Sequence, residues 1–227
     1  MKSLRLSLGL TVISFALGLP AYGAPITLSG GTASTIPGSQ ANNDFIPLLF
    51  GGPQIGGYFG SQILFSAAPG WTLTVDFFGA EAGYVNSFVY SGNSVFTHNG
   101  GLKIASDLGS PLQTFSTSIS GSGMLPFSFL VNRGAGSVMN GSNPNDFAGA
   151  ARGANFFATC DPLRQAAGAG GRDCDSVYLF LDDGGAGPDD DHDDFLVRVS
   201  VVPEPATIVT GLVGFGLFVT RRLKRRQ

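Results

Sequence analysis

The residues of this chain whose side chains could bind an ion or take part in a reaction are mainly a group of aspartates. Between residues 173 and 194 the sequence holds nine aspartates: Asp173, Asp175, Asp182, Asp183, Asp189, Asp190, Asp191, Asp193 and Asp194. Most of them lie in Leu-Asp-Asp-Gly-Gly-Ala-Gly-Pro-Asp-Asp-Asp-His-Asp-Asp-Phe, residues 181–195, whose residues 182–194 are called the acidic stretch below. Carboxylates this close repel one another. A folded loop of this composition therefore needs either a counter-charge or full solvation.

A hard cation such as Ca²⁺ would supply that counter-charge. Calcium takes about six to eight oxygen ligands, and glycines let backbone carbonyls turn toward the ion. The aspartates that this interpretation assigns to the metal are Asp182, Asp183, Asp189, Asp191, Asp193 and Asp194. The spacing is not that of an EF-hand, because no Gly follows the third acidic position and no Glu closes the loop. A solvated acidic turn without metal is the other interpretation, and the sequence leaves both open. In either case we expect His192 on the surface.

Motifs of known catalytic machinery are missing from the sequence. It contains no Gly-x-Ser-x-Gly, Walker loop or His-Glu-x-x-His. His98 and His192 are the only histidines, and the setting of His98 in Thr-His-Asn-Gly-Gly predicts a turn. Paired carboxylates hydrolyse glycosides only at a defined separation across a cleft, which aspartates clustered on one loop do not indicate. We therefore expect a protein that is not an enzyme.

The two cysteines, Cys160 and Cys174, are predicted to form a disulfide. A metal site is the weaker alternative, because two thiols without nearby histidines lack a ligand set. The enclosed segment is rich in Gly and Ala, and closing a loop of this length stabilises a fold by ~3 kcal/mol in the chain-entropy model.

The segments on either side of the acidic stretch have the pattern of β-strands. Residues 177–181 and 195–201 are apolar and β-branched, and Phe195, Val197, Val199 and Val201 share one face. Residues 71–77 alternate apolar and polar side chains, which places Trp71 toward the core. Other predicted strands cover residues 84–90, 94–97, 112–119 and 127–131, with a hairpin turn at Ser91-Gly92-Asn93; residues 143–157 are predicted as a short helix or long loop. The fold class predicted is all-β, a single jelly-roll-like β-sandwich over residues 24–201.

The acidic hairpin resembles a C-terminal motif common in secreted bacterial β-domains of unknown function. In that motif a strand ending in an aromatic-x-Asp/Glu-Asp unit leads through a Gly/Asp loop into a second acidic strand. The matching residues are Phe180, Asp182, Asp183, Asp189, Asp191, Asp194, Phe195 and Val197. The resemblance implies a β-sandwich whose last hairpin carries the acidic loop, and it implies no enzymatic activity.

The N-terminal residues have the pattern of a signal peptide. Lys2 and Arg5 precede an apolar run over residues 6–19, and Ala21-Tyr22-Gly23 predicts cleavage by signal peptidase after Gly23. An N-terminal membrane helix fits less well, because the apolar run is short. We therefore expect export of the chain, with residues 1–23 removed.

The C-terminal residues 202–227 form a second targeting segment in three parts. Pro203, Glu204 and Pro205 are followed by an uncharged apolar stretch, 206–220, and by a basic tail over residues 221–227. Fifteen helical residues reach about 22 Å at ~1.5 Å per residue, which is short for a membrane span. The cations of the tail would stay on the cytoplasmic side; they are Arg221, Arg222, Lys224, Arg225 and Arg226.

This three-part tail resembles the PEP-CTERM sorting signal of Gram-negative, exopolysaccharide-producing bacteria. In that family a membrane protease, the exosortase, is thought to recognise and remove the tail, which releases the protein or transfers it to the cell surface. The resemblance implies exosortase as a processing partner and transient anchoring by the helix 206–220. An ordinary C-terminal membrane anchor is the alternative.

The net charge of the domain between the two targeting segments bears on which class of partner it could bind. The chain has 13 Lys and Arg against 16 Asp and Glu, and seven of the cations but only Glu204 of the acids lie in the two terminal segments. The domain between them keeps 13 − 7 = 6 basic and 16 − 1 = 15 acidic residues, about −9 in all. We therefore expect no nucleic-acid partner.

The function predicted is that of a non-catalytic, exported cell-surface or extracellular-matrix protein associated with exopolysaccharide, with Ca²⁺ as its one candidate cofactor. A carbohydrate-binding module is the alternative, which needs exposed aromatics such as Trp71 or some of the tyrosines. A secreted hydrolase is the third possibility.

Overall fold

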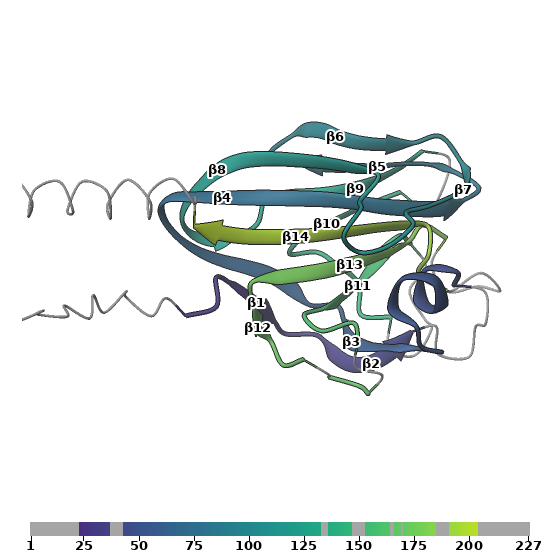
Figure 1. The fold of residues 1–227 in the computed structure, drawn as a ribbon, viewed down its shortest axis with the longest axis horizontal. Helices are drawn as coiled ribbons and strands as arrows, with labels where there is room; N and C mark the ends of the chain where they lie inside the picture. Colours follow the sequence, from purple (N-terminus) through teal and green to yellow (C-terminus); the bar gives the residue numbers. More distant parts are fainter. Residues whose placement is uncertain are drawn as a thin grey trace, which may run out of the picture.

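The computed structural model describes residues 23–36, 43–132, 136–146, 153–163, 166–168, 170–184 and 191–203. In these residues the chain is all-β, as predicted, with one short π-helix (Figure 1). The elements in chain order are β1 (Ile26–Ser29), β2 (Thr32–Ile36), η1 (Ile46–Phe50), β3 (Ile55–Phe59), β4 (Gln62–Ala82), β5 (Val85–Tyr90), β6 (Asn93–His98), β7 (Gly101–Ile104), β8 (Gln113–Met124), β9 (Phe127–Asn132), β10 (Ser137–Met139), β11 (Asn155–Thr159), β12 (Asp173–Cys174), β13 (Ser176–Asp182) and β14 (Phe195–Pro203).

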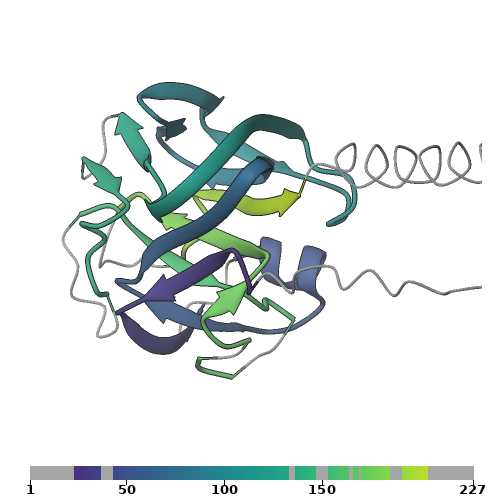
Figure 2. The same ribbon diagram turned by 90° about the vertical axis from the view of Figure 1, so that its left-hand side faces the viewer.

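The described strands form two antiparallel sheets. The large sheet has ten strands in the order β12-β1-β4-β14-β13-β11-β3-β2, with β7 and β8 also paired to β4; the small sheet has the order β10-β9-β5-β6. The long strands β4 and β8 run side by side and curl together (Figures 1 and 2). Beyond a bend at Ala68-Pro69-Gly70, β4 changes its partner from β1 to β14.

The main hydrophobic core draws side chains from both sheets. Val75, Leu181 and Val197 of the large sheet share one cluster with Phe88 and Phe129 of the small sheet. Phenylalanine rings form much of this core: the ring centroid of Phe195 lies 4.5 Å from that of Phe77 and 6.0 Å from that of Phe129. The predicted inward face of the last strand is confirmed, because Phe195, Val197, Val199 and Val201 are all buried.

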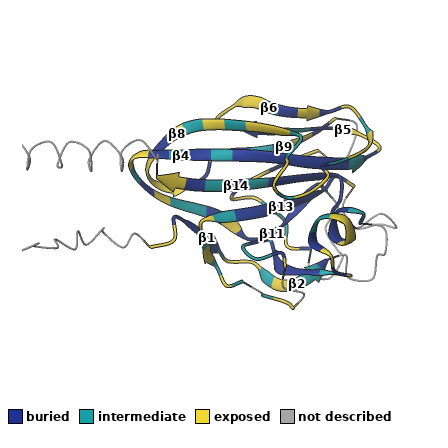
Figure 3. Cartoon of the chain, viewed as in Figure 1, coloured by how far each residue is buried: buried dark blue, intermediate teal, exposed yellow. Residues whose placement is uncertain are grey.

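A second apolar cluster covers part of the opposite face of the large sheet. Phe180 and Leu196 alternate with the residues of the main core along β13 and β14, so their side chains point the other way. Phe45, Ile46 and Phe50, in and before η1, pack against them. Strand β13 is consequently buried on both faces over most of its length, and β14 is buried on both faces at its start, from Phe195 to Val197 (Figure 3).

Most of the predicted strands are present, with some differences at their ends. Tyr90 pairs with Asn93 across a two-residue turn, Ser91-Gly92, whose φ angles of 48° and 80° are both positive, so Asn93 belongs to β6 and not to the turn. Residues 155–157 lie in β11, which corrects the helix or loop predicted for 143–157. Phe156 and Phe157 are both fully buried, one on each face of the sheet, so β11 shows no alternation that a sequence pattern would detect.

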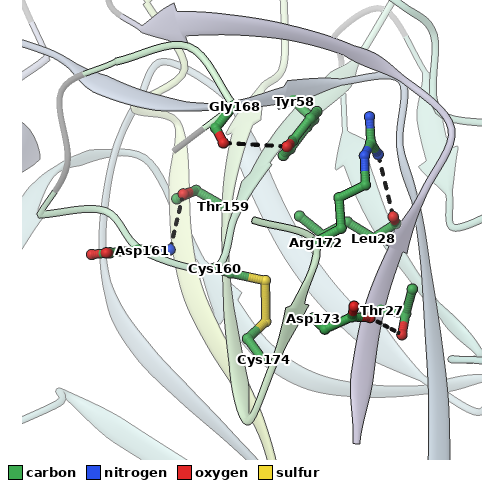
Figure 4. The surroundings of a disulfide bond; sticks show 10 residues. All are labelled: Thr27, Leu28, Tyr58, Thr159, Cys160, Asp161, Gly168, Arg172, Asp173 and Cys174. Atoms are coloured by element: carbon green, nitrogen blue, oxygen red, sulfur yellow. Dashed lines mark hydrogen bonds between the residues drawn. A yellow bond between two sulfur atoms is a disulfide. The ribbon is translucent and has the colours of Figure 1, made fainter. Parts of the chain in front are cut away.

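The predicted disulfide between Cys160 and Cys174 is confirmed (Figure 4). It joins the end of β11 to β12, which is the edge strand beside β1. Next to it Arg172 stacks on the ring of Tyr58, 3.9 Å from the centroid, and donates a hydrogen bond to the carbonyl oxygen of Leu28. The disulfide therefore fixes the loop between the cysteines at the edge of the large sheet.

The two termini of the described domain lie at one end, and the acidic stretch lies at the other (Figure 1). Ile26 pairs with Phe65 and Pro203 pairs with Trp71, on the two sides of the bend in β4. Asp182 and Phe195, which flank the acidic stretch, lie at the far ends of β13 and β14. No helix in the described ranges is long and apolar enough to cross a membrane.

Candidate metal centre

The acidic stretch leaves the end of β13 and returns at the start of β14. The backbone N–H of Asp194 donates to the carbonyl oxygen of Leu181 at 3.1 Å, which closes this hairpin at its base. Five of the six predicted metal ligands are described, and each is at most 6% exposed: Asp182, Asp183, Asp191, Asp193 and Asp194. The interpretation as a solvated turn is therefore wrong for these five residues. Asp189 lies outside the described residues.

Adjacent aspartates face different sides of the large sheet. Asp182 follows Phe180 and Tyr178 on the outer face of β13, whereas Asp183 follows Leu181 toward the small sheet. The predicted ligand set is therefore divided into separate groups of side chains.

The first group contains Asp183, Asp194 and Asn86, a residue of β5 in the small sheet. The Asn86 side chain is fully buried, and its Nδ2 donates to Asp183 Oδ2 and to the carbonyl oxygen of Asp194. The backbone N–H of Asp183 donates to Asp194 Oδ2 at 2.7 Å. Within the part of the chain that the structure describes, Asn86 Oδ1 is buried and accepts no hydrogen bond. The group presents only oxygen ligands, as Ca²⁺ prefers.

The second group lies on the outer face and contains Asp146, Asp182 and His192. All three are buried, and one ligand atom from each lies within 4.8 Å of the others. Asn155 Oδ1 accepts a hydrogen bond from His192 Nε2 at 2.8 Å, and Asn155 Nδ2 donates to Asp182 Oδ2 at 3.3 Å. Asn155 thus orients both side chains. A ligand set with an imidazole suits a transition metal better than Ca²⁺.

The surface position predicted for His192 is wrong, since the residue is 1% exposed. Its ring packs against those of Phe59 and Phe157, at centroid distances of 5.2 and 6.4 Å. Burial lowers the pKa of His192 to about 3, so the imidazole is neutral at physiological pH.

The third group lines a cavity of about 370 Å³. Asp191, Asp193 and Glu81 of β4 contribute carboxylates to this cavity, together with Ala82, Gly83, Gly101 and Leu102. The backbone N–H of Glu81 donates to the carbonyl oxygen of Asp193 at 3.0 Å, which holds the acidic stretch against the end of β4.

Asn43 fixes the returning part of the acidic stretch beside η1. Its Nδ2 donates to the carbonyl oxygens of Asp191 and His192, at 2.8 and 3.2 Å, and its Oδ1 accepts from the N–H of Ile46. His192 has a left-handed φ of 60°, an uncommon conformation for a non-glycine residue. These contacts hold the backbone in the turn that places Asp191 and Asp193 at the cavity.

Burial makes the charged forms of these carboxylates costly. It raises the pKa of Asp193 to about 10, with the negative charge of Asp191 acting in the same direction. It also raises the pKa of Asp194 to about 9, with a further contribution from Asp183. A divalent cation would reverse this preference, because it stabilises the deprotonated carboxylates. The carboxylates of Asp183 and Asp194 are oxygen ligands of the kind that Ca²⁺ prefers.

Several of these residues carry no signal in the sequence. Asn86, Asn155, Asp146 and Glu81 lie between 27 and 112 positions from the aspartates they accompany, and only folding brings them together. The sole local hint is that Asn86 and Asn155 occupy positions in mostly apolar strands.

The remaining predicted residues lie away from the acidic stretch. Trp71 is 6% exposed, as its register predicted. His98 is the last residue of β6 and not part of a turn, and its Nε2 lies 2.8 Å from the carbonyl oxygen of Gly101. Pro203 ends β14. The other sorting residues and both targeting segments lie outside the described residues: 1–22, Glu204, Pro205, the stretch 206–220 and the basic tail, namely Arg221, Arg222, Lys224, Arg225 and Arg226.

No protein-family model matches the chain, and a comparison with curated protein sequences finds no match.

Proposed function

We propose that this chain is an exported, non-catalytic protein of the cell surface or extracellular matrix, whose domain is stabilised by Ca²⁺ at its acidic end. The observation that carries the proposal is the burial of five aspartates, each at most 6% exposed, in one short stretch between two core strands. Burying several carboxylates close together is costly, and a bound Ca²⁺ would offset their like charges.

The calcium ligands that we propose are the carboxylates of Asp183 and Asp194. A turn of the Asn86 amide, whose Nδ2 donates to Asp183, would bring Asn86 Oδ1 to the ion as a third oxygen. Asn86 joins the small sheet to the acidic stretch of the large sheet. An ion bound there would connect the two sheets at the end of the molecule opposite the termini. We class the arrangement as a β-sandwich, because one core contains residues from both sheets.

Sorting to the surface is proposed from the two targeting segments. The signal peptide of residues 1–23 and the Pro203-Glu204-Pro205 tail support export followed by processing by exosortase. The disulfide Cys160–Cys174 supports an oxidising compartment. Exopolysaccharide is the matrix component that we propose as partner. The carbohydrate-binding alternative has less support, since the buried Trp71 offers no exposed platform for a sugar ring.

Thermal unfolding in Ca²⁺ and in EGTA tests the metal proposal. We expect the melting temperature of the wild-type chain to rise with Ca²⁺, by an amount equivalent to ~2.7 kcal/mol at a hundredfold excess over Kd. In D183N and D194N the rise should be lost or strongly reduced. Asp175→Asn is the matched control, because Asp175 precedes β13 and is exposed, and its response should equal that of the wild type.

A wild-type melting temperature that is the same in Ca²⁺ and EGTA would contradict the calcium proposal. Parallel melts with Mn²⁺ and Zn²⁺ distinguish the two groups of ligands. A shift with these metals that H192A removes and D194N retains would place the metal at Asp146, Asp182 and His192 instead.

A further inference from the structure

The strand β8 (Gln113–Met124) forms a long edge of the large sheet. It pairs with β4 from Leu64–Met124 to Phe77–Gln113. No strand within the described ranges pairs with its other side. Its 12 residues exceed the other sheet-edge strands described, since β6 has 6, β2 has 5, β10 has 3 and β12 has 2.

The sequence of β8 lacks charges and prolines, two of the features that keep edge strands apart, and its pairing with β4 is regular from Gln113 to Ile119. Gln-Thr-Phe-Ser-Thr-Ser-Ile-Ser-Gly-Ser-Gly-Met contains no charged residue and no proline. Natural edge strands are usually protected by charges, prolines, short length or a covering element. Most residues of β8 are exposed, including Ser116 and Ser118, whereas Ile119 points into the core. The outer edge is therefore accessible for backbone hydrogen bonding.

We infer that β8 is a docking edge for a second copy of this chain, which pairs through its own β8 in antiparallel orientation. An antiparallel strand pairs with itself about a two-fold axis, so the same surface serves both copies. The domain carries a net charge of about −9, and the uncharged edge of β8 lets two such copies meet there without like-charge contacts. Hydroxyl pairs across neighbouring strands already occur here, since Thr74 Oγ1 lies 3.3 Å from Ser116 Oγ.

Antiparallel pairing turns the two copies end for end. Pro203 pairs with Trp71, which pairs with Ile119 near the middle of β8. Because the two-fold axis reverses the direction of every strand, the C-terminal ends of the two copies would point in opposite directions. This geometry suits copies released from the membrane, or copies held on two facing surfaces. The pairing of two copies through β8 does not depend on calcium binding.

The test uses the full chain in mild detergent with two different affinity tags. We expect the wild-type chain to form a dimer, measured by light scattering and by co-purification of the two tags. Ser118→Lys and Ser118→Asp, each alone, should weaken self-association by about tenfold or more, because like charges then face each other across the axis. A mixture of the two variants should recover the association. Ser137→Lys on the exposed edge strand β10 is the matched control and should behave like the wild type.

Two outcomes would overturn the inference. The wild-type chain could remain monomeric at high concentration. Alternatively, it could associate to a degree that neither Ser118 charge changes, which would place the contact on another surface, such as the apolar tail. Circular dichroism of each variant checks that the sheet is intact. If Ser118→Lys does not fold, the same charge pair at Ser116, which is also exposed, provides the test.

Discussion

Asn86 lies where the small sheet meets the acidic stretch, and burial limits the hydrogen bonds that its side-chain amide can make. The carboxylate of Asp183 accepts from its Nδ2, and the carbonyl of Asp194 lies 3.5 Å from the same atom. The amide supplies a neutral donor to the Asp183 carboxylate and the Asp194 carbonyl, but its own Oδ1 accepts no hydrogen bond among the described residues. This pattern is costly in a metal-free protein and favourable beside a cation.

The raised carboxyl pKa values predict how stability depends on pH when the metal is removed. The pKa of Asp194 is raised from 3.8 to about 9 by burial and by Asp183. A group whose folded-state pKa is raised contributes stability that is fully present below its unfolded pKa and is lost as pH rises toward its folded pKa. In EGTA we therefore expect the melting temperature to fall between about pH 5 and about pH 8.

With saturating Ca²⁺ the fall should be smaller or reversed, because the ion binds the deprotonated carboxylates. Asp194→Asn in EGTA should flatten the pH profile and raise the melting temperature at about pH 8. Melting curves in EGTA that stay unchanged over this pH range would contradict the buried-carboxylate description.

At the scale of elements, two features position the parts of the large sheet. One is the hairpin of β13 and β14, two central strands that place the acidic stretch at the end of the core. The other is the disulfide, which attaches the loop after β11 to the short strand β12. Strand β12 pairs with β1 through only two residue pairs, Ile26–Cys174 and Thr27–Asp173, so its position depends on the covalent link.

Removing the disulfide should therefore destabilise the domain. We expect the variant with both Cys160→Ser and Cys174→Ser to lose ~3 kcal/mol of unfolding free energy, because a loop of this length is no longer closed in the unfolded chain. Urea denaturation with and without dithiothreitol measures this loss. The double variant serves as the control, since dithiothreitol should not change its transition. A wild-type protein with equal stability in both conditions would show that the link contributes nothing.

At the scale of the whole molecule, the acidic end lies opposite the end where the described domain begins and stops (Figure 1). A domain attached at its C-terminal end would present Asp183, Asp191 and Asp194 away from the attachment. The cavity lined by Glu81 and Asp193 belongs to the same far end. This separation keeps the proposed metal centre apart from processing at Pro203-Glu204-Pro205.

The sorting proposal predicts a change in the fate of the whole chain. Replacing Pro203, Glu204 and Pro205 by alanine should retain the protein in the membrane of a bacterium that carries an exosortase, because the processing enzyme no longer recognises the tail. Immunoblots of membrane and medium fractions measure the distribution, with a full deletion of the exosortase as the reference. Equal release of the wild-type and alanine variants would refute processing at this motif.

The all-β class, most of the strands and the disulfide could be predicted from sequence. Periodic alternation in residues 71–77 and 195–201 reflects a half-buried surface directly, and two cysteines leave one pairing. Strand β11 could not be predicted in this way, because Phe156 and Phe157 are buried on opposite faces and remove the alternation.

The composition of the acidic stretch predicted a bound cation, but it could not predict how the aspartate side chains are arranged. Sequence cannot tell whether neighbouring carboxylates converge, since successive residues of a strand point to opposite sides of the sheet. The tertiary structure separated Asp182 from Asp183, buried His192, and brought Asn86 and Asn155 to the aspartates from distant strands. The order of residue types along the chain determined the strands. The packing of the two sheets decided which carboxylate and amide side chains lie together.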